Sequence, residues 1–216
     1  MSNDLLNYLQ SFLTQERKDK FTEVSSQRTR HFTVVTEGLR HLHNTSAVIR
    51  SCEAFGVQDV HVIDEKSGKR IDKEIAMGAQ KWTSIHRHAS VDNVMDELRE
   101  KGYRIVATTP HHEAHTLADF DITQPAALFF GKESIGLSQN VIDKADDYIY
   151  IPTFGFTQSL NISVSAAIII QDLMHRLKDS DIDWKLKEDE LKALQLQWTK
   201  DNIKSLKQVM ERYNAS

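Results

Sequence analysis

The stretch 151–170, IPTFGFTQSLNISVSAAIII, decides how this sequence folds. A loop with Pro and Gly ends at Ser159 and Asn161, and an apolar helix is expected to follow directly. The first N–H groups of a helix have no partner within the helix, so such a loop can present them, with short polar side chains, to a ligand. The stretch therefore predicts a ligand-binding loop that leads into a buried helix.

Strands and helices alternate along the chain before this stretch. Apolar, β-rich runs predict strands near residues 32–36, 60–63, 82–86, 103–108, 126–130 and 148–151. Helices are expected near 44–55, where Asn44 is a suitable N-cap, near 91–101, after Ser138, and near 160–177. Such alternation is typical of an α/β domain with a mainly parallel sheet.

Both ends of the chain show apolar residues at helical spacing. They predict one helix near residues 3–22 and one long helix near 186–213. We therefore expect an N-terminal helical extension (1–29), a central α/β domain (30–178) and a C-terminal helical extension (179–216).

The composition is that of a soluble globular protein, with 40% hydrophobic and 27% charged residues among 216. The longest apolar run, 166–170, is too short to span a membrane, and the first residues do not resemble a secretory signal. A single cysteine, Cys52, excludes an intrachain disulfide framework. Together these features predict a cytoplasmic location.

Charge gives a weak indication of nucleic-acid binding. The net charge of −4 argues against indiscriminate binding, although phosphate affinity depends on where basic residues cluster. The cluster that includes Arg28, Arg30 and Arg40 is a candidate RNA-binding surface. A solvated surface of scattered charges explains it as well.

Several familiar ligand motifs are excluded. Gly131 and Gly136 have the spacing of a phosphate-binding loop, but Leu137 stands where Lys is required. No G-x-G-x-x-G follows a predicted strand, so a Rossmann dinucleotide site is not expected. The segment 111–115, HHEAH, lacks the two-residue gap of a zinc helix, and a His-rich surface loop explains it equally well. We expect no metal site.

Three segments combine a functional side chain with small neighbours: 44–50 (NTSAVIR), 130–138 (FGKESIGLS) and the stretch 151–170. Each has a purely structural explanation. Asn44 could cap a helix, Arg50 could form a surface ion pair, and Glu133 could be an ordinary loop carboxylate. Gln158, Ser159 and Asn161 supply more polar groups than one helix cap needs.

In this order, the three segments resemble the motifs of the SpoU (TrmH-type) RNA ribose 2′-O-methyltransferases. Asn and Arg stand six residues apart, F-G-x-E-x-x-G follows a strand, and I-P-x-x-G-x-x-Q-S-L-N-x-S comes last. The similarity covers residues 32–176. It implies an α/β fold with a trefoil knot in its C-terminal half, a homodimer, and S-adenosylmethionine as the cofactor.

The resemblance also assigns roles to particular residues. It implies catalytic or positioning roles for Asn44, Arg50, Glu133, Ser159 and Asn161. The cofactor would be held by Thr108, Thr109, Gly131, Ile151, Pro152, Ser159 and Leu160. Arg28, Arg30, Arg40 and Arg50 are the candidates for RNA contact.

The implied reaction is attack of a ribose 2′-hydroxyl on a sulfonium methyl group. In the family, the arginine that matches Arg50 is proposed as the general base, yet a guanidinium holds its proton far above neutral pH. We expect Arg50 to be essential either as the base or as a phosphate anchor. Short helices at both ends favour tRNA guanosine 18 as the target. Another tRNA or rRNA ribose, or a non-catalytic RNA-binding role, is the alternative.

Overall fold

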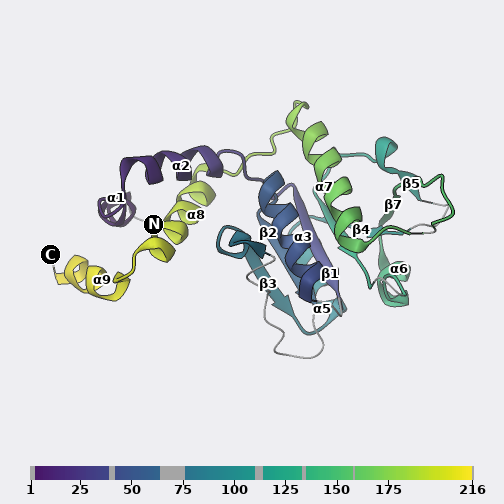
Figure 1. Cartoon of the computed structure of the whole chain (residues 1–216), viewed down its shortest axis with the longest axis horizontal. Coiled ribbons are helices and arrows are strands. Elements are labelled where there is room, and N and C mark those ends of the chain that lie inside the picture. Colours follow the sequence, from purple (N-terminus) through teal and green to yellow (C-terminus); the bar gives the residue numbers. More distant parts are fainter. Residues whose placement is uncertain are drawn as a thin grey trace. The chain divides into compact units, whose positions relative to one another are not determined.

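A computed structural model describes residues 3–38, 42–63, 76–109, 114–132, 135–157 and 159–215. Contacts divide the chain into two compact units (Figure 1). The α/β unit comprises residues 29–184, and the helical unit joins residues 1–28 to residues 185–216. The two terminal segments therefore form one unit, whereas the sequence suggested two separate extensions.

The α/β unit is built on a seven-stranded sheet with the strand order β3-β2-β1-β6-β4-β7-β5. Every pairing between these described strands is parallel. The strands are β1 (Phe32–Glu37), β2 (Asp59–Ile63), β3 (Ser84–His88), β4 (Arg104–Thr108), β5 (His115–Thr116), β6 (Ala126–Phe130) and β7 (Asp147–Tyr150). The predicted α/β class with a mainly parallel sheet is confirmed.

Helices cover both faces of the sheet, so alternate residues of β6 enter different cores. Ala126, Leu128 and Phe130 join the core under α3 (Leu42–Phe55) and α7 (Ile162–Lys178). Ala127 and Phe129 join the core under α5 (Val91–Glu100) and α6 (Gln139–Lys144). This burial on both faces explains why the central strands read as continuous apolar runs. In Figure 1, α3 and α7 lie side by side on one face, and they are in contact.

Short elements complete this unit. The 3-10 helices are η1 (Ala79–Lys81) and η2 (Leu117–Asp119). The predicted strand near 82–86 begins two residues later, and β5 was not predicted. The prediction that Asn44 caps its helix is wrong, because α3 begins at Leu42 and takes Asn44 into its first turn.

The helical unit consists of α1 (Asn3–Gln10), α2 (Gln15–Ser25), α8 (Glu188–Asn202) and α9 (Leu206–Ala215). The single helix predicted at each end is therefore wrong, because both are broken. Thr14 caps α2 with its side chain, and Ile203 takes an extended conformation after α8. These breaks let α1 and α9 fold back, so that Leu9, Leu196 and Val209 share a small apolar core. Within the described ranges, no helix has both the length and the apolarity to cross a bilayer.

Candidate active site

The carboxyl ends of β4, β6 and β7 bring three predicted cofactor-binding segments to one edge of the sheet. β4 lies between β6 and β7, and all three strands run in the same direction. Thr109, Gly131 and Ile151 each follow directly after one of these strands. Ligands of open α/β sheets bind in the crevice outside the carboxyl ends. The fold thus gathers residues from three loops that span 42 positions of the sequence, from Thr109 to Ile151.

The two threonines after β4 tie this edge together. The Thr108 hydroxyl donates to the Phe129 carbonyl of β6 at 2.8 Å. The Thr109 N–H donates to the Ile149 carbonyl of β7 at 3.0 Å, and Thr109 is buried. Both residues therefore fix the spacing of the strand ends.

Gly131 is required by close packing of its own loop. A Cβ at this position would lie 2.2 Å from the Gly136 carbonyl carbon and 2.2 Å from the Leu137 nitrogen. Backbone hydrogen bonds of 2.9 and 2.8 Å between Lys132 and Gly136 close the turn, and Gly136 has a φ of +71°. No other residue type fits at position 131 without moving the backbone.

The loop after β7 offers open backbone groups to a ligand. Ile151 packs against the core, while residues 152–157, 159 and 160 are exposed. The peptide groups of these exposed residues form no hydrogen bonds with one another or with other described residues. Apolar Ile151 and Leu160 at the two ends of this loop, with free peptide groups between them, fit a nucleoside cofactor that is held mainly by the backbone.

Asn161 begins α7 and is fixed by its neighbour. Its Oδ1 accepts from the Ser163 N–H at 2.8 Å and from the Ser163 hydroxyl at 2.6 Å. The Nδ2 group has no partner among the described residues and remains available as a donor. Ser159, two residues earlier, is exposed. Helix capping thus accounts for one end of the Asn161 amide and leaves the other end for a ligand.

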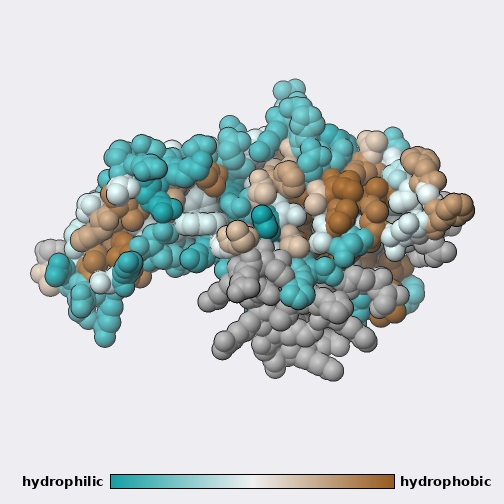
Figure 2. Space-filling model, viewed as in Figure 1, coloured by the Kyte–Doolittle hydropathy of each residue, from teal (hydrophilic) through white to brown (hydrophobic). Residues whose placement is uncertain are grey.

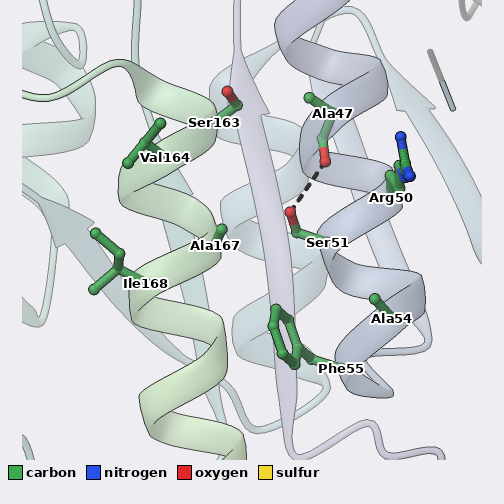
Figure 3. A pocket seen from close by; sticks show the side chains of 9 residues that line it. All are labelled: Ala47, Arg50, Ser51, Ala54, Phe55, Ser163, Val164, Ala167 and Ile168. Carbon is green, nitrogen blue, oxygen red and sulfur yellow. Dashed lines mark hydrogen bonds between the residues drawn. The ribbon is translucent and has the colours of Figure 1, made fainter.

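Arg50 lies on the exposed side of α3, at the rim of a groove between α3 and α7 (Figure 3). No described carboxylate pairs with its guanidinium, and in Figure 3 the side chain points away from α7. The groove has a volume of 420 Å³ and is lined by Ala47, Arg50, Ser51, Ala54, Phe55, Ser163, Val164, Ala167 and Ile168. An exposed arginine without a carboxylate partner can hold a phosphate.

The other predicted residues have different surroundings. Arg28 is 1% exposed, and its guanidinium stacks over Trp198 at 5.7 Å. Arg30 pairs with Asp59 at 2.7 Å. Burial of Arg28 and pairing of Arg30 do not favour the predicted RNA contact.

Two of the predicted site residues, Glu133 and Arg40, lie outside the described residues. Asn44 is described, and its side chain is half-buried in α3. Residues 111–113 of the HHEAH segment also lie outside. Among the described residues, no group of three or more His, Cys, Asp or Glu side chains is placed to hold a metal ion.

Comparison with known proteins identifies the family. The profile of the SpoU rRNA Methylase family matches residues 31–171. This chain belongs to that family. A Borreliella burgdorferi protein named tRNA (guanosine(18)-2′-O)-methyltransferase is 36% identical over 208 residues, which make up 95% of each chain. The resemblance drawn from the three sequence motifs is thereby confirmed.

Two solved structures share the architecture. The Aquifex aeolicus TrmH/SpoU tRNA modifying enzyme superposes with a TM-score of 0.80 at 29% identity, and the match covers 88% of this chain and 98% of that one. AviRb of Streptomyces viridochromogenes, solved in complex with AdoMet, gives a TM-score of 0.64 at 24% identity over 73% of this chain and 65% of its own. The second likeness concerns the fold alone. The match to the Aquifex aeolicus enzyme covers 88% of this chain, which is more than the α/β unit contains. That match therefore extends into the terminal helices.

Proposed function

We propose that this SpoU-family protein methylates the ribose 2′-oxygen of guanosine 18 in tRNA, with S-adenosylmethionine as the methyl donor. The observation that carries the proposal is the end-to-end similarity to a relative with that named activity, over 95% of both chains. The similarity includes the helical unit, which lies outside the 31–171 family match. A tRNA-modifying role also agrees with the cytoplasmic location expected from the sequence.

The cofactor, when bound, supplies an electrophilic methyl group to the 2′-oxygen. We assign the free peptide groups of residues 152–157, 159 and 160, together with the apolar side chains of Ile151 and Leu160, to holding the cofactor at the carboxyl edge of the sheet. Thr108, Thr109 and Gly131 keep the neighbouring strand ends and their loop in place. The unpartnered Nδ2 of Asn161 and the exposed Ser159 hydroxyl are then free to donate to the ribose or the cofactor.

Arg50 is assigned to the RNA phosphate beside the reacting ribose. Its guanidinium is exposed and has no described carboxylate to neutralise it, which leaves its full charge for an anion. A bidentate phosphate contact would fix the 2′-hydroxyl in line with the methyl group, and such positioning can lower a barrier by several kcal/mol. Asn44 and Glu133 complete the set of catalytic or positioning residues in this proposal.

The distribution of charge supports tRNA contact by the helical unit. This unit has 11 Lys and Arg against 9 Asp and Glu, a formal charge of +2. The α/β unit has 16 basic against 22 acidic residues, a formal charge of −6. Phosphate attraction therefore favours the helical unit over the surface of the catalytic unit as a whole.

We also propose that the protein is a homodimer, with the trefoil knot that the family resemblance implies. The small residues of the groove between α3 and α7 would let a second copy approach closely. Beside them, Val164 and Ile168 are 45% and 38% exposed. Figure 2 shows apolar side chains gathered over α7 on this face. Sedimentation equilibrium should give twice the mass of 24.8 kDa.

Labelled methyl transfer tests the catalytic proposal. The protein is incubated with labelled S-adenosylmethionine and two unmodified tRNA transcripts, one with guanosine 18 and one with adenosine at that position. Methyl incorporation only into the first supports the assignment. Equal incorporation into both moves the target to another nucleotide. Cofactor binding without incorporation into tRNA, but with incorporation into ribosomal RNA, favours the rRNA alternative that the family's name suggests.

A further inference from the structure

Two phenylalanines of the loop after β7 are completely exposed. Phe154 is 99% exposed and Phe156 is 108% exposed, relative to a fully accessible residue. Of the nine phenylalanines in the chain, no other is more than 47% exposed. A phenylalanine ring stabilises a protein mainly when it is buried. These two rings contribute nothing to either core, so their position calls for an external partner.

The pair lies within the candidate active site. Both residues belong to the loop that joins the carboxyl end of β7 to α7, and this loop is drawn at the right-hand edge of Figure 1. Ser159 follows Phe156 by three residues, and Asn161 by five. A ligand that reaches Ser159 and Asn161 therefore passes close to the two rings.

The chemistry of the loop favours stacking over ionic attraction. Residues 151–161 contain no charged side chain. Phe154 and Phe156 alternate along the loop with Thr153, Gly155 and Thr157, all of them exposed, so small side chains separate the two rings in the sequence. A protein interface is usually apolar and closely packed at its centre. Isolated aromatic faces between small polar residues are instead typical of surfaces on which nucleic-acid bases stack.

The charge of the α/β unit points the same way. With a formal charge of −6, this unit gains little from phosphate attraction as a whole, yet the proposed reaction requires it to hold a segment of RNA. Base stacking supplies affinity that does not depend on charge.

We infer that Phe154 and Phe156 form a stacking platform for RNA bases next to the methylated ribose. This inference rests on the proposed function. Each ring lies flat against an unstacked base of a single-stranded or loop region, and together they present the target nucleotide to Ser159 and Asn161. The two residues act in binding and positioning of the RNA.

Substitutions that separate ring stacking from apolar burial test the inference. Phe154 and Phe156 are each changed to Ala, Leu and Trp in the full-length protein. Leu keeps apolar bulk but has no aromatic face, whereas Trp keeps the face. For each variant, the Kd for an unmodified tRNA transcript, the Kd for S-adenosylmethionine and the oligomeric state are measured. Unfolding temperatures confirm that the variants are folded.

We expect each Ala or Leu substitution to raise the Kd for tRNA about fivefold or more. A fivefold increase corresponds to about the smallest effect expected for loss of one base–aromatic stack. The Trp variants should bind tRNA about as tightly as the natural protein. The slope of log Kd against log salt should stay the same in all variants, because no ion pair is removed. A 2-aminopurine base placed beside the target nucleotide should be quenched by the natural protein and by the Trp variants, and less by the Leu variants.

Three results would overturn the inference. The first is that the Leu variants bind tRNA as tightly as the natural protein. The second is that the oligomer dissociates, which would make the loop a protein interface. The third is that the affinity for S-adenosylmethionine falls in parallel with that for tRNA, which would make the rings a cover for the cofactor. Each of these results differs from failure of the proposed function, because in such a failure the natural protein itself would transfer no methyl group to tRNA.

Discussion

The buried carboxylate of Glu37 accepts a hydrogen bond from the Ser138 N–H at 2.8 Å, across 101 positions of the sequence. Glu37 ends β1 and Ser138 caps α6. The bond therefore anchors the far end of the loop that begins at Gly131. Glu37 was not among the site residues predicted from the sequence. Its position at the end of a buried strand was the available signal.

Loss of this bond should weaken the loop and the cofactor site together. We expect Glu37→Ala to lower the free energy of unfolding by about 1–3 kcal/mol, since it leaves the half-buried Ser138 N–H without its charged acceptor. The affinity for S-adenosylmethionine should fall as well, while Glu37→Gln, which keeps an acceptor oxygen, should recover most of both. Urea unfolding and calorimetric titration measure the two effects. Exposed Glu100, changed to Gln, is the matched control and should behave as the natural protein.

Arg50 should be essential for activity and dispensable for stability. Its exposed side chain forms no hydrogen bond or ion pair with the described residues, so Arg50→Ala should change the free energy of unfolding by less than about 0.5 kcal/mol. Methyl transfer to tRNA should fall by about 100-fold or more, as for loss of other groups that act on the transition state. Arg50→Lys should recover little, because an ammonium cannot make the bidentate contact.

Arg87 supplies the control for this experiment. It is exposed near the carboxyl end of the edge strand β3, and the strands β2 and β1 separate it from β6. Arg87→Ala should keep full activity. Arg50→Ala with undiminished methyl transfer would refute the assignment of Arg50 to the site.

Gly131 offers a test of the loop geometry. The Cβ of Gly131→Ala would lie 2.2 Å from backbone atoms of residues 136 and 137, which cannot move as a flexible side chain would. We expect a loss of about 1–3 kcal/mol in stability, as for other overpacked sites. Gly155→Ala is the matched control, since the nearest atom there lies 3.9 Å away. Equal unfolding temperatures for the two variants would contradict the described loop.

The sequence predicted the sheet and the site segments because their signals are local. Buried strands such as β6 are apolar throughout, and the loop before α7 carries Pro, Gly and an N-cap within eleven residues. The breaks at Thr14 and Ile203 could not be predicted in this way. The apolar spacing continues across them, and only the packing of Leu9 against the C-terminal helices requires the chain to fold back.

Long-range packing also decided two other differences. Arg28 looked like a surface cation, yet Trp198, far along the chain, provides a ring that covers it. The strand β5 has only two residues, too few for any periodic pattern, and depends on pairing with β7. In both cases the deciding partner is distant in sequence, so no local pattern indicates it.

A histidine cluster on the β2–β3 edge of the sheet should make stability depend on pH. His61 is 2% exposed, and its Nδ1 lies 2.8 Å from the Nε2 of His88. The ring of His86 stacks on it at 4.7 Å. Burial, with repulsion from His86 and His88, lowers the pKa of His61 to about 4. The other charged groups that act on this cluster are Asp59, Arg30, Glu97 and Lys101.

The sign of the effect follows from proton uptake. Unfolded His61 binds a proton below its ordinary pKa of 6.5, whereas the folded protein resists it until about pH 4. The unfolded state therefore binds more protons in this window, and stability falls as the pH drops from 6.5 to 4. For His61 alone the loss amounts to about 3 kcal/mol. Burial lowers the pKa of His88 as well, which adds to the same trend.

Urea unfolding at pH 7, 6, 5 and 4.5 measures this dependence. His61→Gln should flatten the fall in stability between pH 6.5 and 4, because Gln does not titrate. His175, which is 70% exposed, provides the control, and His175→Gln should retain the full dependence. A pH profile of His61→Gln that parallels the natural protein would show that other groups cause the acid sensitivity. A flatter profile in His61→Gln but not in His175→Gln would assign the acid sensitivity to the buried His61 of β2.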